Sequence, residues 1–105
     1  IEDFCEMIKE LVNLIGEDNI GIGSDLCLNW PDDVVMWMRN GKWTKNIDYG
    51  ESKDKNPKWP KLPSWYKQPS DLNNLFYLMC ENNIPEKVST KIIGQNWFNF
   101  MKNQF

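Results

Sequence analysis

One short segment, Ile20-Gly21-Ile22-Gly23-Ser24, constrains the fold of this chain more than any other. It is apolar and interrupted by glycine, it follows a helix-like stretch after a tight polar turn, and it has the length of a strand. These features together predict one buried strand of the parallel type. A single parallel strand cannot satisfy its own backbone hydrogen bonds, so its neighbouring strands must come from elsewhere. The segment therefore predicts an α/β protein with one core strand.

Helical periodicity lies on both sides of this segment. Between Asp3 and Ile15, apolar residues recur at the spacing of one helical face, and Gly16 follows as a natural C-cap. Further helices are expected over residues 70–82, after an N-cap, then over 85–94, with a proline in its first turn, and over 96–102. The chain is thus expected to be mostly helical around its one strand.

A long irregular segment, residues 26–69, separates the expected strand from the closing helices and holds every proline except Pro85. Within it, residues 32–38 have the pattern of one or two helical turns. A loop of this length in a compact domain is usually functional. Its tryptophans, interleaved with prolines, suit a ligand cleft, with Trp30 and Trp43 as candidate substrate contacts. The other interpretation is that Trp and Pro pin the loop onto the protein body or onto a second subunit.

Composition and charge exclude several classes of function. The net charge of -3 and the pI near 4.9 give no basis for nucleic-acid binding, which needs clustered Lys and Arg. The chain has no histidine, so the commonest general base and the commonest zinc ligand are both missing. Three cysteines, an odd number, argue against a disulfide framework and favour a cytoplasmic over an exported protein. No apolar run approaches the roughly 20 residues that cross a bilayer.

A carboxylate, Asp25, stands just past the carboxyl end of the expected strand. Catalytic groups of barrels and open α/β sheets gather at that end, and Gly21 and Gly23 let backbone or substrate come close. The other interpretation is a glycine-rich strand whose last residue caps a turn. The neighbouring acids Asp32 and Asp33 indicate solvation of a helix N-terminus rather than a catalytic dyad.

Three segments, taken together, resemble the membrane (renal) dipeptidase family, peptidase family M19. They are Asp18-Asn19-Ile20-Gly21-Ile22-Gly23-Ser24-Asp25, the loop residues 37–50 that look like a bacterial branch, and Ile92-Ile93-Gly94-Gln95-Asn96-Trp97-Phe98. Their order and spacing carry the resemblance, which spans essentially the whole chain. The first residue is Ile1 rather than an initiator Met, so a fragment of a longer protein is expected.

The resemblance implies a fold and an activity. The fold would be the C-terminal portion of a (β/α)8 TIM-type barrel, with residues 1–105 as part of a single domain. Residues 1–105 would supply its last helix, its last strand, the loop 26–69 and the closing helices 70–102. The activity would be hydrolysis of dipeptides by two zinc ions in the full-length parent. Most zinc ligands of the family lie on earlier strands, so this segment alone is expected to bind no zinc and to be inactive.

The resemblance also assigns roles to individual residues. Asp25 would be catalytic, orienting the substrate or relaying a proton beside the metals rather than binding them. Gly21, Gly23 and Asn96 would be structural, and Asn96 would tie its turn to the barrel by hydrogen bonds. Asn99 stands where the family often has an arginine, which removes the salt bridge expected there.

A rival of a different class is a non-catalytic interaction domain that uses the Trp-rich loop. For the peptidase the expected partner is a dipeptide substrate. Exposed apolar faces that belong against the missing barrel lead us to expect a homo-oligomer or association with that barrel part.

Overall fold

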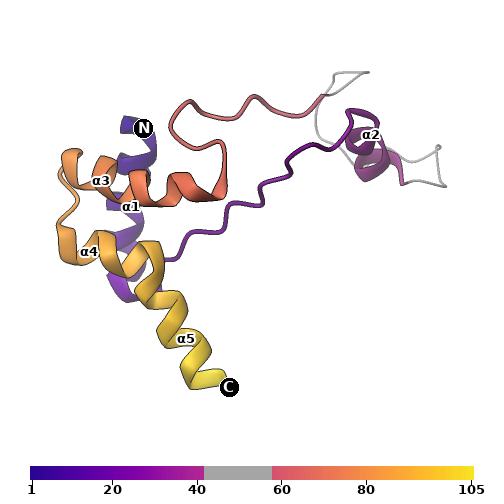
Figure 1. Cartoon of the computed structure of the whole chain (residues 1–105). Coiled ribbons are helices and arrows are strands. Elements are labelled where there is room, and N and C mark those ends of the chain that lie inside the picture. The colour runs from indigo at the N-terminus through magenta and orange to yellow at the C-terminus, as the bar shows by residue number, and fades with distance from the viewer. Residues whose placement is uncertain (42–57) are drawn as a thin grey trace. The chain divides into compact units, whose positions relative to one another are not determined.

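The computed structural model describes residues 1–41 and 58–105. It divides the chain into two compact units, one made of Ile1–Leu26 with Pro63–Phe105 and the other of Cys27–Leu62 (Figure 1). The helices are α1 (Glu2–Ile15), α2 (Asp33–Asn40), α3 (Leu72–Glu81), α4 (Glu86–Thr90) and α5 (Asn96–Gln104), with 3-10 turns at Glu17–Asn19 and Pro69–Asp71 and a π-helical turn at Lys91–Gln95. None of the helices in the described ranges is long and apolar enough to cross a membrane.

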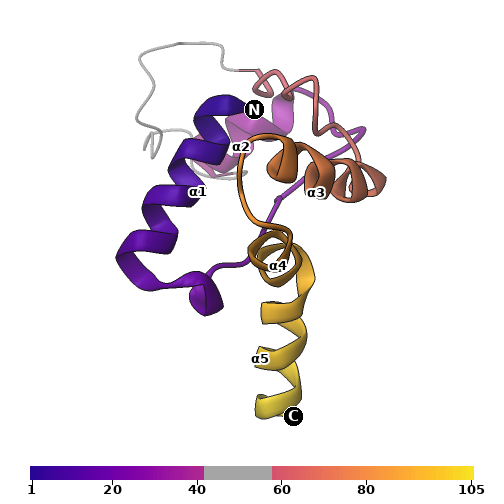
Figure 2. The ribbon, with the colours of Figure 1, turned by 90° about the vertical axis from the view of Figure 1, so that its left-hand side faces the viewer.

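The core of the larger unit lies where α1, α3 and the run that begins with α4 face one another (Figure 2). Each helix contributes residues from one apolar face, as the sequence periodicity predicts. The buried members of this core are Cys5, Ile8, Ile20, Leu75, Met79, Ile84, Val88 and Ile92. Burial raises the pKa of the Cys5 thiol, because an apolar surrounding disfavours the thiolate.

Helices α1 and α3 both end in well-formed C-terminal caps. Gly16 has φ 84 and its N–H donates to Val12 O at 3.0 Å, which ends α1. After α3, Asn83 has φ 64, and the N–H groups of Asn83 and Ile84 donate to Cys80 O and Met79 O at 3.1 and 3.0 Å. This is a Schellman motif, and it turns the chain into α4.

The expectation of an α/β fold with a core strand is wrong for the residues that the structure describes, which form helices, turns and irregular segments without any strand. Ile20 is extended, with φ -115 and ψ 135, and it is buried in the core. The segment that follows has no ladder partner, and Gly21, Gly23 and Ser24 are exposed. The physical reason is that side chains of α5, described below, satisfy carbonyls that a neighbouring strand would otherwise bind. The described residues therefore do not form part of a TIM-type barrel.

The two helices expected over residues 85–94 and 96–102 are one continuous helical run. Gly94 was expected to end the first of them, but it lies inside the π-helical turn that joins α4 to α5. Beyond this turn, α5 extends away from the other helices of the unit (Figures 1 and 2). None of its residues is buried, and its exposed apolar side chains are Trp97, Phe98, Phe100 and Met101.

The smaller unit contains α2 and the segments that flank it. Val34 on α2 is buried, and Gly41 with φ 68 follows the helix. Trp59 Nε1 donates a hydrogen bond to Pro31 O at 3.1 Å, which joins the two described ends of this unit. The helical turns expected over residues 32–38 thus correspond to α2.

Candidate functional site

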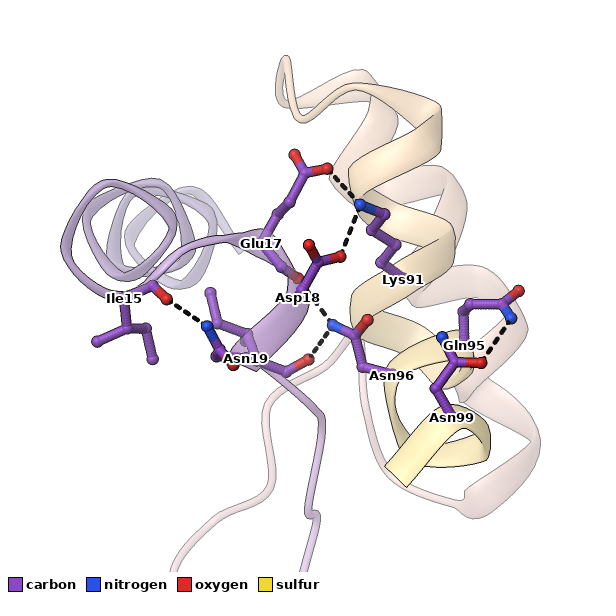
Figure 3. Close-up of polar contacts among 9 residues, drawn as sticks. Ile15, Glu17, Asp18, Asn19, Lys91, Gln95, Asn96 and Asn99 are labelled. Carbon is purple, nitrogen blue, oxygen red and sulfur yellow. Dashed lines mark hydrogen bonds and ion pairs between the residues drawn. The ribbon is translucent and has the colours of Figure 1, made fainter. Parts of the chain in front are cut away.

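The segment expected to carry the site lies against the start of α5 within the larger unit (Figure 3). The Asn96 amide Nδ2 donates to Glu17 O at 2.7 Å and to Ile20 O at 2.8 Å. The Trp97 indole Nε1 donates to Ile22 O at 3.0 Å. Two neighbouring side chains of α5 therefore hold alternate carbonyls of the extended segment, in place of a strand.

The π-helical turn sets which side chains face this segment. Residues five apart on an α-helix lie about 140° apart around the axis, because each turn takes 3.6 residues. The i→i+5 bonds of a π turn widen the helix, so that residues five apart lie on nearly the same face. Lys91 and Asn96 are five apart across this turn, and both reach the Glu17–Asn19 turn.

The Lys91 ammonium forms a paired ion contact with this same 3-10 turn (Figure 3). Its Nζ lies 2.5 Å from Glu17 Oε1 and 2.7 Å from Asp18 Oδ1. Hydrogen bonds to Asp18 and then to Glu17 raise the pKa of Lys91 above its usual value, because both carboxylates favour the charged amine. The lysine therefore holds two adjacent carboxylates that would otherwise repel each other.

This contact predicts a pH dependence. Because the pKa of Lys91 is higher in the folded chain, its contribution to stability is fully present below the unfolded value of 10.5 and is lost as the pH rises through the folded value. The difference in the free energy of unfolding between the wild type and Lys91→Met should therefore be constant below pH 10.5 and shrink as the pH rises above it. Urea titrations at pH values of about 8 and 11 would measure this. Lys87→Met, which removes an exposed lysine of α4, is the control, and an equal convergence for it would refute the assignment.

Gly21 lies directly against the Trp97 indole. A Cβ added at Gly21 would stand 2.6 Å from Trp97 Nε1, which is closer than real contacts allow, whereas a Cβ at Gly23 would meet no atom within 4 Å. Beside this contact is a cavity of about 350 Å³, lined by Asp18, Asn19, Ile20, Gly21, Asn96, Trp97 and Phe100. The absence of a side chain at Gly21 is thus what lets the indole reach Ile22 O.

The structure brings together some of the residues proposed from the sequence and separates others. Gly21 and Asn96 both lie at the contact with α5. Asp25 is exposed in the same unit, and its φ of 46 places its backbone in the left-handed region that Asp enters more readily than most residues. Trp30 is 58% exposed and belongs to the smaller unit. Trp43 lies outside the described residues.

The described residues do not offer a site for the zinc pair implied by the resemblance. A zinc ion in a protein usually takes three or four ligands from Cys, His, Asp and Glu. No group of three such residues stands close enough to hold a metal in the described part of the chain, and the whole sequence lacks histidine. The adjacent acids Glu17 and Asp18 are both paired with Lys91.

Two contributors to this site, Lys91 and Trp97, do not emerge from the sequence. Lys91 reads as an ordinary surface lysine, since the helical spacing of 3.6 residues places it away from Asn96. Trp97 reads as one of several apolar residues on a short helix. In the sequence, only the polar turn at residues 17–19 and the glycine at position 21 hint at a contact. Neither indicates which residue, 70 or more positions later, makes that contact.

Comparison of the chain with protein-family models, with curated proteins and with solved structures gives no match.

Proposed function

We propose that this chain is a helical segment of a zinc-dependent dipeptidase and contributes Asp25 to its active site. The proposal rests on the resemblance of three segments to the membrane dipeptidase family. One structural observation supports it: the two resembling segments that the structure describes, Asp18–Asp25 and Ile92–Phe98, contact each other through Asn96 and Trp97, whose hydrogen-bond partners lie more than 70 positions earlier. Segments that contact each other in the fold can contribute to one functional site.

The proposed role of Asp25 is to act on the substrate beside the metals. Its carboxylate would bind the free ammonium group of a dipeptide or relay a proton to the leaving amine. The zinc pair, when held by ligands from the rest of the peptidase, would supply an activated water and a Lewis acid. This chain alone is proposed to be inactive, because the described residues offer no set of metal ligands.

The partners proposed for this chain are a dipeptide and the remaining polypeptide of the peptidase. The exposed apolar side chains of α5 support such an association, since a short helix gains most of its stability from packing of its apolar face. Association of two copies through the same helix is the alternative. The odd number of cysteines supports a cytoplasmic location.

The test is substitution of Asp25 by Asn in the full-length protein. We expect dipeptide turnover to fall about 100-fold, the scale of a lost proton relay, while the zinc content measured by atomic absorption stays unchanged. Asp32→Asn is the matched control, because it makes the same change at an exposed carboxylate of the smaller unit. Loss of zinc in Asp25→Asn would place the residue on the metal, and unchanged turnover would refute its role.

The second candidate function is a non-catalytic interaction domain that uses its Trp-rich loop. The exposure of Trp30 and Trp37, 58% and 40%, favours it, because exposed tryptophans are common anchors of protein interfaces. Dipeptide turnover by the zinc-loaded full-length protein distinguishes the two candidates. Turnover by the wild type would support the peptidase, and absence of any turnover would support the interaction domain.

A further inference from the structure

The extended segment is held along one edge by side chains of α5. In an extended backbone, the polar groups of residues i and i+2 point to the same side, so Ile20 O and Ile22 O share an edge. Both of these carbonyls accept hydrogen bonds from the start of α5, from Asn96 at 2.8 Å and from Trp97 at 3.0 Å. The start of α5 therefore fixes the segment at two points on its way to Asp25.

The hydrogen bonds from Asn96 and Trp97 fix different parts of the segment. Asn96 also binds Glu17 O, so it joins the segment to the 3-10 turn and acts at the base, where Ile20 enters the core. Trp97 acts further out, at Ile22, which is followed directly by Gly23. Ile22 is three residues before Asp25, so the point from which the chain runs on to Asp25 depends on how Ile22 is held. Because glycine has wide backbone freedom, Gly23 adds no hold of its own.

We propose that Trp97 is a positioning residue that fixes the backbone at Ile22 and thereby places the Asp25 carboxylate for the dipeptidase reaction. This inference rests on the proposed function and adds to it a residue that the resemblance does not assign. Trp97 touches neither substrate nor metal in this scheme. It acts through the backbone of residues 22–25, and Gly21 is required because any side chain there would displace the indole.

The kinetic test uses Trp97→Phe in the full-length protein, a change that keeps an aromatic ring and removes the Nε1 donor. We expect kcat to fall about tenfold with KM within about twofold, since misplacing a reacting group affects turnover more than binding. Zinc content and Tm should match those of the wild type. Trp37→Phe, the same change at a 40% exposed residue of the smaller unit, should leave kcat unchanged.

The structural test uses the 105-residue chain and does not depend on activity. In ¹H–¹⁵N spectra, Gly21→Ala should shift the Trp97 indole resonance and the backbone resonances of Gly23 to Asp25. Gly23→Ala, which adds the same methyl group into open space, should leave the indole resonance in place. Gly21→Ala also displaces the indole while keeping its donor, so it gives a second route to the same kinetic effect.

The outcomes separate this inference from the proposed function. A wild-type protein with turnover, combined with unchanged kcat in Trp97→Phe and unmoved Asp25 resonances in Gly21→Ala, would overturn the positioning role and leave the peptidase intact. A zinc-loaded wild-type protein without dipeptide turnover would overturn both, and this is measured before any variant is made. If Trp97→Phe lowers Tm as well as kcat, its role is purely structural, and this result would also overturn the inference.

Discussion

Truncation of Ile92 to alanine is expected to lower the free energy of unfolding of the larger unit by about 3–4 kcal/mol. Ile92 is fully buried, and it lies on the π-helical turn in the same core as Cys5, Leu75 and Met79. Large-to-small changes in such cores remove buried apolar surface and leave a cavity, which costs about 2–5 kcal/mol. A unit of roughly 70 residues has only a few kcal/mol of stability, so this variant should be largely unfolded at 37 °C.

The neighbouring residue gives the control for this prediction. Ile93 is partly buried against the same core, so Ile93→Ala should cost about half as much. Urea denaturation followed by far-UV circular dichroism would give both values, with a shift in midpoint and an unchanged slope. Equal losses for the two variants would mean that the π turn does not present Ile92 to the core as the structure has it.

Replacement of Asn96 by alanine is expected to cost about 2 kcal/mol. The change removes two hydrogen bonds and leaves Glu17 O and Ile20 O without their amide donor. Each such bond is worth about 1 kcal/mol, and a carbonyl that loses its partner in a partly buried place adds a desolvation cost. Asn96→Asp should be worse, because a carboxylate cannot donate to these carbonyls and lies near the acidic turn at residues 17–18.

Asn99→Ala is the matched control for this second prediction. Asn99 lies on the same helix, is exposed, and accepts a hydrogen bond from Gln95 at 3.3 Å, so its loss should cost less than about 0.5 kcal/mol. Thermal unfolding of both variants would measure the difference. The double variant Asn96→Ala with Lys91→Met should lose less than the sum of the two single losses, because both side chains hold the same turn. Strict additivity would contradict a shared role.

Local patterns predicted most of the helices of this chain but not its fold class. The apolar periodicity of residues 3–15 and 70–82 corresponds to α1 and α3, and Gly16 and Asn83 end those helices through the conformations that such residues favour. The segment at Ile20 looked like a core strand because four apolar and glycine residues in a row, Ile20 to Gly23, fit a buried strand. Its carbonyls instead accept hydrogen bonds from side chains about 75 positions later, and a local sequence pattern cannot predict so distant a partner.

The candidate site shows the same division between local and long-range information. Asp25 and Gly21 were singled out from the glycine-rich segment, and Asn96 through the resemblance to the dipeptidase family. That Gly21 and Asn96 lie at the same contact with α5 follows only from the fold. Gly94 was expected to end a helix, because glycine commonly does so. It is accommodated instead by the π turn, and the resulting rotation of α5 is what directs Asn96 and Trp97 to the extended segment.

The π-helical turn at Lys91–Gln95 also marks a position where the length of this chain can vary. A π turn corresponds to one residue inserted into an α-helix. If one residue were absent there, Lys91 and Asn96 would stand four apart on an ordinary α-helix, about 40° from each other, and would still share a face. Natural variants of this sequence that lack one residue between them should therefore keep both side chains on the Glu17–Asn19 turn, whereas loss of one residue between Trp97 and Phe100 would rotate Phe100 by about 100°, away from the cavity beside Gly21.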